Sequence, residues 1–299
     1  MGPFRKKSPP RQSGADRAGT QASTQSVVIV DGQPISVTTP YLLPKDIQEQ
    51  NRLDLQHILL KAVLQNNYLA PLTQPGTILD VGCGTGLWAF EIAQAFPEAT
   101  VMACDLIEPP VGALSPPANY QFLQADVLKG LPFPDQQFDF VHQRFLVLAI
   151  PAQAWPGVLR ELVRVTRAGG WVEVVETQLA SENMGPMTRQ LSNWIIELGH
   201  QRGIECGQVP PLAEELRRAG LSNVVQRQIA IPVGKWGGEV GTGMQTNGVA
   251  GMQALKPLII SHLGVATSEF DRVLALSVAE YDQLQMSVPY VLVYGQRPF

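Results

Sequence analysis

The sequence has few cysteines, no long apolar runs and little charge of either sign. Its 299 residues include three cysteines and no C-x-x-C pair, which fits free thiols in a reducing compartment and argues against a disulfide framework or a structural metal. We therefore expect a cytoplasmic protein. No apolar run approaches the roughly 18 residues of a membrane span, so we expect no membrane partner. A net charge of −4 gives no electrostatic footprint for nucleic acid.

The first 25 residues differ in composition from the rest of the chain. They interleave basic residues with Pro, Gly, Ser and Gln and contain almost nothing apolar; the basic residues are Arg5, Lys6, Lys7, Arg11 and Arg17. This composition predicts a disordered basic arm over residues 1–25, and the missing apolar segment argues against a secretory signal. A solvated tail and a contact with an acidic protein partner are both compatible with it.

Residues 26–72 are predicted to form a hairpin followed by a helical cap. Asp31-Gly32 between two apolar runs predicts the hairpin turn. Asp46 and Glu49 have the spacing of a helix-capping box, and we expect the helix to run to about residue 66. Its apolar positions would pack on a main domain over residues 73–299: Leu55, Ile58, Leu59, Ala62 and Val63.

Residues 78–86 read Ile-Leu-Asp-Val-Gly-Cys-Gly-Thr-Gly, the most informative stretch of the chain. A buried strand that ends in Gly82, Gly84 and Gly86 lets the backbone approach a bound molecule with no Cβ in the way. The helix expected over residues 87–96 directs its N-terminal amides at the same place. This pattern predicts a nucleotide-like cofactor.

Two cofactor classes fit these glycines. Gly84-x-Gly86-x-x-Ala89 matches the dinucleotide fingerprint, and Asp105 follows it by about 20 residues. However, the glycine run begins directly after the strand with Asp80 still inside it, and Asp126 ends a further strand-like run. These two features favour a cofactor class other than the dinucleotides.

The central block alternates strands with helices. Strands are expected over residues 77–81, 100–104, 120–124, 138–142 and 171–176, and helices over 87–96 and 155–166. This spacing requires crossover connections and a parallel sheet, to which runs 224–233 and 290–294 would add two strands. Ligands bind such sheets at the carboxyl ends of the strands, where five polar residues fall: Asp80, Asp105, Asp126, His142 and Glu176.

The pattern D-x-G-x-G-x-G from Asp80, with acids at Asp105 and Asp126, resembles the class I S-adenosylmethionine-dependent methyltransferases. The resemblance implies an α/β fold with a Rossmann-like, doubly wound sheet of seven mainly parallel strands and an antiparallel last strand. It implies S-adenosylmethionine as cofactor and S-adenosylhomocysteine as product, with the glycine loop on the methionine part, Asp105 on the ribose hydroxyls and Asp126 on the adenine amino group. The cofactor-binding residues that it indicates are Asp80, Gly82, Cys83, Gly84, Gly86, Asp105, Leu106, Asp126, Val127, His142 and Arg52.

Further stretches are similar to the LaeA-like methyltransferases, known mainly in fungi as regulators of secondary metabolism, with relatives of small-molecule function. They are Tyr41-Leu-Leu-Pro-Lys-Asp-x-x-Glu-x-x-Arg52-Leu-Asp-Leu-Gln-His57, Phe138-Asp-x-Val-His142-x-Arg144 and the ending Gly295-Gln-Arg-Pro. The resemblance implies methyl transfer to an O, N or C atom of a small-molecule acceptor. The alternatives are a regulatory protein, or a peptide or protein methyltransferase, that acts through a protein partner. No [D/N]-P-P-[Y/F] sequence follows the strand expected over residues 138–142, which argues against a nucleic-acid acceptor.

In-line methyl transfer from a sulfonium needs mainly alignment, and a general base helps only when the nucleophile must lose a proton. Candidates for this acceptor-side chemistry are His142, Glu176 and Tyr41, and a structural role is open for each. His200 lies on a helix expected over residues 187–200, which could cover the pocket. Arg52 fits a carboxylate clamp or an ion pair with an acid on its own helix.

The C-terminal third holds a glycine-rich insertion. Residues 236–248 contain five glycines, which predicts a segment too flexible for a core element. With helices expected near residues 251–263 and 268–286, the insertion over residues 235–286 is either a mobile lid on the pocket or a plain surface insertion.

Overall fold

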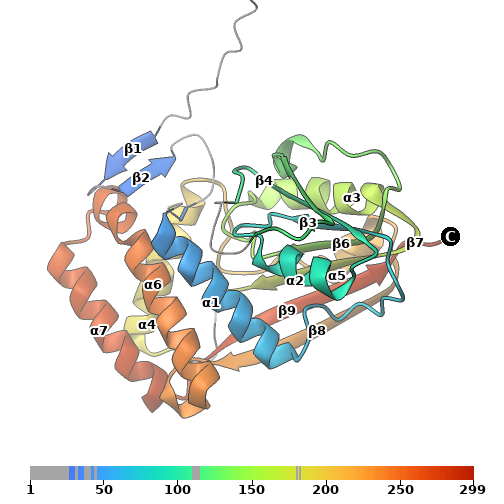
Figure 1. Ribbon diagram of the computed structural model, residues 1–299. Coiled ribbons are helices and arrows are strands. Elements are labelled where there is room, and N and C mark those ends of the chain that lie inside the picture. Colours follow the sequence, from blue (N-terminus) through green and yellow to red (C-terminus); the bar gives the residue numbers. More distant parts are fainter. Residues whose placement is uncertain are drawn as a thin grey trace, which may run out of the picture.

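The computed structural model describes residues 27–30, 33–36, 42–43, 46–109, 115–179, 181 and 183–299 (Figure 1). The expected basic arm and Tyr41 lie outside these residues. Strands β1 (Val27–Val30) and β2 (Gln33–Ser36) pair antiparallel, so the predicted hairpin is confirmed. No helix within the described part of the chain combines the length and the hydrophobicity needed to cross a membrane.

A seven-stranded sheet forms the centre of the molecule, in the order β5-β4-β3-β6-β7-β9-β8. The strands are β3 (Thr77–Val81), β4 (Thr100–Asp105), β5 (Tyr120–Gln124), β6 (Phe138–Arg144), β7 (Thr166–Thr177), β8 (Ser222–Pro232) and β9 (Ser287–Gln296). Strand β9 runs antiparallel to both of its neighbours, whereas the pairs from β5 to β7 are parallel. The predicted Rossmann-like fold is therefore confirmed.

Helices cover both faces of the sheet. Helix α2 (Leu87–Ala95) packs against one face, in a core that includes Ile78 and Phe140. The neighbouring residues Leu79 and Val141 point to the opposite face, where they pack against α3 (Trp155–Val165) and α5 (Leu212–Arg218). Adjacent strand residues alternate between faces, so these continuous apolar runs require cover on both sides.

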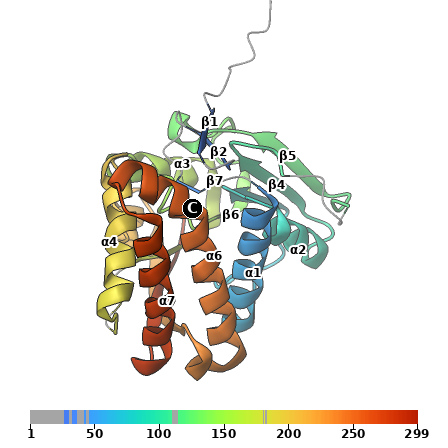
Figure 2. The same cartoon turned by 90° about the vertical axis from the view of Figure 1, so that its left-hand side faces the viewer.

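Four helices gather at one end of the sheet (Figures 1 and 2). They are α1 (Ile47–Leu64), α4 (Pro186–His200), α6 (Gly238–Leu263) and α7 (Thr267–Gln283). The Asp46 carboxylate accepts a hydrogen bond from the Glu49 backbone N–H at 2.9 Å, which confirms the predicted start of α1. Glu280 of α7 accepts from the first amides of α4, those of Met187 and Thr188. This cap fixes α4 against α7.

The apolar stripe predicted for α1 is only partly correct. Leu59 is buried, but Ile58 is 55% exposed and Ala62 also faces solvent. The buried positions instead include the polar residues Glu49 and His57. The difference arises because Glu49 pairs with Arg52 of the same helix, His57 lies 3.2 Å from Glu91 of α2, and α6 packs along α1, none of which helical periodicity reveals.

The glycine-rich segment is helical, so the prediction that it is too flexible for a core element is wrong. Helix α6 begins at Gly238, and its glycines serve close packing. A Cβ on Gly241 would lie 2.2 Å from the Gly234 carbonyl oxygen, and one on Gly243 would lie 2.5 Å from Leu59 Cδ2. Absence of a side chain at these positions allows α6 to approach its neighbours, and this contact offsets the low helix propensity of glycine.

Substitution by alanine should change the free energy of unfolding in opposite directions at two glycines of α6. Nothing lies within 4 Å of a Cβ at Gly248, so Gly248→Ala should raise the free energy of unfolding by about 0.4–1 kcal/mol. Gly243→Ala meets Leu59 and should lower it by about 1–3 kcal/mol. Urea denaturation of both variants measures the difference, and equal effects of the two substitutions would contradict the packing role of Gly243.

Candidate active site

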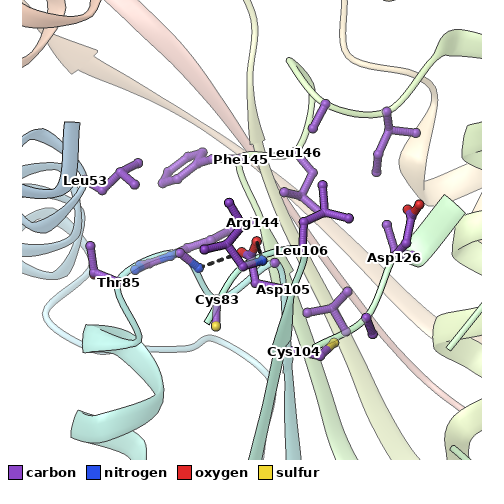
Figure 3. Close-up of a pocket in the computed structure, with 18 of the residues that line it drawn as sticks. Leu53, Cys83, Thr85, Cys104, Asp105, Leu106, Asp126, Arg144, Phe145 and Leu146 are labelled. Atoms are coloured by element: carbon purple, nitrogen blue, oxygen red, sulfur yellow. Dashed lines mark hydrogen bonds between the residues drawn. The ribbon is translucent and has the colours of Figure 1, made fainter. Parts of the chain in front are cut away.

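A cavity of about 570 Å³ lies at the carboxyl ends of β3, β4 and β6 and is closed on one side by α1 (Figure 3). Seven of the predicted cofactor residues line it: Gly82, Cys83, Gly84, Asp105, Leu106, Asp126 and Val127. The other predicted site residues among those described do not line it: Asp80, Gly86, Arg52, His142 and Glu176.

The glycine loop after β3 has the backbone that its sequence requires. Gly82, Gly84 and Gly86 all have positive φ angles, of 72°, 58° and 80°. The amides of Gly82 and Cys83 donate to the Cys104 carbonyl at 2.8 and 3.1 Å, which holds the loop against the end of β4. A Cβ on Gly82 would lie 2.7 Å from Leu146 Cδ2, so the loop is also packed tightly against the turn after β6.

Two carboxylates follow β4 and β5 along the same edge. Asp105 Oδ2 accepts from the Gly84 N–H at 2.9 Å. Asp126 Oδ1 accepts from the Leu128 N–H at 3.0 Å, and its other oxygen pairs with Lys129 at 3.1 Å. Both carboxylates line the cavity, and an ionised carboxylate offers about four acceptor positions, so both are groups of a type that accepts hydrogen bonds from a ligand there.

The end of β6 and the turn after it present three cavity residues that the sequence interpretation missed as site residues: Arg144, Phe145 and Leu146. Phe145 has a φ of 57°, a conformation that costs a non-glycine residue about 1–3 kcal/mol and that clusters at functional sites. Its amide donates to the Val175 carbonyl at 2.9 Å. Arg144 belongs to the stretch that resembles the LaeA-like proteins, which is the one signal that pointed to this turn.

Glu176 supports this turn instead of facing the cavity. Its side chain is fully buried, and its two oxygens accept from the Leu146 and Val147 amides at 2.9 and 3.1 Å. Burial raises the pKa of Glu176 to about 8, although these two hydrogen bonds oppose the change. The geometry therefore gives Glu176 a positioning role, not the predicted contact with an acceptor.

The titration of Glu176 should make stability depend on pH. The folded state retains a proton that the unfolded state loses above about pH 4.5, so the free energy of unfolding falls as pH rises toward about 8. Glu176→Gln mimics the protonated acid and lacks this contribution. Relative to this variant, we expect the wild type to lose roughly 2–4 kcal/mol between about pH 5 and 8. Denaturant titrations at several pH values measure the difference, and a constant difference would contradict the assignment.

His142 and Asp80 form a buried pair beneath the glycine loop. They are register partners on β6 and β3, and His142 Nδ1 lies 3.0 Å from Asp80 Oδ1. The imidazole stacks on the Trp88 indole with a centroid separation of 3.8 Å, and only 1% of His142 is exposed. Burial lowers the pKa of His142. A neutral ring enclosed in this way joins β3, β6 and α2, so its geometry does not support the predicted role as a base.

Arg52 pairs with protein groups. Its guanidinium binds both Glu49 oxygens at 2.6 and 2.7 Å and donates to Asn247 Oδ1 of α6 at 3.2 Å. Asn247 Nδ2 donates back to the Arg52 carbonyl at 2.7 Å. The ion-pair alternative for Arg52 is thus the one observed, and it joins α1 to α6. His200 is exposed and pairs with Glu205, away from the cavity.

The cavity fits the expected cofactor. Two positive-φ glycines that line it, Gly82 and Gly84, leave its floor without side chains, and the carboxylates Asp105 and Asp126 lie at the ends of the next two strands. The volume lies within the roughly 300–1,000 Å³ typical of small-molecule sites. Within the described residues, no cluster of side chains is suited to a metal ion.

Comparison with known proteins decides the family. A family described as "Methyltransferase domain" matches residues 78–170. Methyltransferase pytC of Aspergillus terreus is 30% identical over 277 residues, which cover 87% of this chain and 84% of that protein. The chain belongs to the class I S-adenosylmethionine-dependent methyltransferases of the LaeA-like group.

Other relatives agree with this assignment to the LaeA-like methyltransferases. Methyltransferase str3 of Strobilurus tenacellus is 40% identical over 138 residues, 46% of this chain and 48% of that protein. The secondary metabolism regulator laeA of Aspergillus flavus is 28% identical over 208 residues, 66% of this chain and 54% of that protein. The solved YcgJ protein of Bacillus subtilis has a TM-score of 0.50 at 18% identity and covers 82% of this chain and 99% of that one, which supports the fold alone.

Proposed function

We propose that this LaeA-like methyltransferase transfers the methyl group of S-adenosylmethionine to a small-molecule acceptor by in-line displacement. The observation that carries the proposal is that one cavity of about 570 Å³ joins the predicted cofactor residues to an apolar wall. Enclosure of cofactor and acceptor in one cavity supplies the alignment on which such a reaction depends.

For the cofactor side, we propose that the glycine loop holds the methionine part through Gly82, Cys83 and Gly84. Asp105 and Leu106 would hold the ribose, and Asp126 and Val127 the adenine. A vicinal diol offers two donors that one carboxylate can accept, which supports the assignment of Asp105. When bound, the cofactor supplies a methyl carbon activated by a sulfonium. Asp80 and Gly86 would act indirectly, by fixing β3 against β6 and by starting α2.

The acceptor side of the cavity is mainly apolar. Its apolar lining residues are Leu53, Phe145, Leu146, Ala149 and Ile150. Helix α1 contributes three polar residues, Glu49, Gln50 and Gln56, and the carboxylate among them, Glu49, is paired with Arg52. No histidine occurs among the described residues that line the cavity. These features support a largely apolar acceptor whose nucleophile loses its proton to solvent or carries none, and they leave the roles of Tyr41 and of a mobile lid as predictions.

Transfer of a labelled methyl group tests the proposal. The protein would be incubated with methyl-labelled S-adenosylmethionine and with host extract divided into small-molecule and macromolecular fractions. Label in a small organic product supports the proposal and identifies the acceptor. Label confined to protein, or no transfer despite cofactor binding, contradicts it.

A regulatory role is the second candidate, favoured by the similarity to the secondary metabolism regulator laeA of Aspergillus flavus. In this hypothesis the basic arm, residues 1–25, would bind a protein partner. Deletion of the arm separates the two candidates, because a metabolite methyltransferase should keep its turnover, whereas a partner-dependent regulator should lose complex formation.

We keep the cytoplasm as the expected location, on the ground that all three cysteines are free thiols.

A further inference from the structure

We propose that Arg144 binds the carboxylate of the cofactor's methionine part, an inference that rests on the proposed function. Arg144 ends β6 and lines the cavity, yet none of the described residues forms a hydrogen bond or an ion pair with its guanidinium. Its recorded contact is with the Phe145 ring, whose centroid lies 5.8 Å from the guanidinium carbon.

The acids whose charges act on Arg144 are bonded to other groups. Asp54 accepts from the Thr85 hydroxyl at 2.6 Å, Asp80 binds His142, and Glu91 binds Lys61 at 2.6 Å. By contrast, the arginine of α1, Arg52, has its own carboxylate partner, Glu49. Burial lowers the pKa of Arg144, which reflects the cost of holding a cation there without a direct counter-ion. An anionic ligand would offset that cost.

The order of the strands predicts where such an anion comes from. Val81 and Gln143 are register partners on β3 and β6, so Arg144 lies beside Gly82 at the start of the glycine loop. Asp105 ends β4 on the other side of β3, two strand spacings or about 10 Å away. A cofactor with its ribose at Asp105 and its methionine part over the glycine loop extends in the direction of Arg144.

The close-up view agrees with this direction. Figure 3 shows Asp126 at the opposite end of the cavity from Leu53 and Thr85, with Arg144 and Phe145 between them. The planar guanidinium can donate two parallel hydrogen bonds to one carboxylate, a geometry that the ammonium of lysine cannot reproduce. The site therefore suits a carboxylate in particular.

Two nucleosides that differ only in the amino-acid part test the proposal. S-adenosylhomocysteine carries the carboxylate, whereas methylthioadenosine has the same adenosine and thioether without it. By calorimetric titration, Arg144→Met should weaken S-adenosylhomocysteine binding by at least about 30-fold and change methylthioadenosine binding by less than about threefold. Arg144→Lys keeps the charge without the planar fork and should give an intermediate loss for S-adenosylhomocysteine.

Lys129→Met is the matched control, because it removes a cation from the opposite end of the same cavity. It should change the affinity for both nucleosides by the same small factor. Retained methylthioadenosine binding shows that Arg144→Met is folded. An equal loss for both nucleosides, or an unchanged affinity for S-adenosylhomocysteine with a raised KM for an acidic acceptor, would overturn the proposal. Failure of the wild type to bind either nucleoside would instead overturn the cofactor site as a whole, and this assignment with it.

Discussion

Replacement of Asp105 by alanine should weaken S-adenosylhomocysteine binding by at least about 100-fold, because two hydrogen bonds to a charged acceptor contribute roughly 3–6 kcal/mol together. The carboxylate accepts from the Gly84 amide at 2.9 Å, so the substitution also removes a contact that orders the glycine loop. In the proposed site the same group accepts from the ribose hydroxyls. Calorimetric titration with S-adenosylhomocysteine measures the change.

Two variants control this experiment. Asp105→Asn keeps an acceptor oxygen for Gly84 but lacks the charge, so its loss of affinity should be intermediate. Asp135→Ala removes an exposed carboxylate that pairs with Arg164, outside the cavity, and should leave the affinity unchanged. Affinity of Asp105→Ala within about threefold of the wild type would refute the ribose assignment.

Alanine at Gly82 should be the most damaging substitution in the loop for stability. Gly82 has a φ of 72°, where a Cβ costs about 1–2 kcal/mol, and its Cβ would collide with Leu146, at a cost of about 1–3 kcal/mol. We therefore expect the free energy of unfolding to fall by about 2–5 kcal/mol in denaturant titrations. Affinity for S-adenosylhomocysteine should fall as well, since Leu146 lines the cavity into which it would be displaced.

Gly84→Ala separates the two contributions to this loss. Gly84 also has positive φ, of 58°, but its Cβ would make ordinary contact with Leu53 at 3.5 Å. Its loss of stability should be limited to the backbone cost of about 1–2 kcal/mol. Leu146→Ala should partly rescue Gly82→Ala by removing the collision. Equal losses for the two glycine variants, without rescue, would show that Leu146 plays no part.

The sequence predicted the parts of the fold that depend on local patterns. The bounds of β3 and β5 agree residue for residue with those expected, because short apolar runs bounded by turn residues define strands clearly. The positive φ angles of the loop glycines follow from the same local pattern. Glycine has no side chain, so no side-chain contact with a distant residue enters this prediction.

The failures concern side chains whose partners are distant in sequence. Arg52 binds Asn247, and Glu176 binds the amides of Leu146 and Val147, neither of which the spacing of residues reveals. The glycine-rich segment is helical because neighbouring residues pack closely against its bare backbone. This stabilisation comes from tertiary packing and not from helix propensity. The motif that contains Arg144 does not predict its role, because the absence of an ion pair with it among the described residues is visible only in three dimensions.

The hydrogen bonds between Arg52 and Asn247 have a consequence for the order in which the site is completed during synthesis. The two residues are 195 positions apart, and ribosomes add roughly 5–20 residues per second. Roughly 10–40 s therefore pass between the synthesis of Arg52 in α1 and that of Asn247 in α6. The glycine loop, Asp105 and Asp126 are all translated within that interval. A nascent chain can thus assemble the nucleoside-facing half of its cavity early, while the wall contributed by α1 is fixed only near the end of translation.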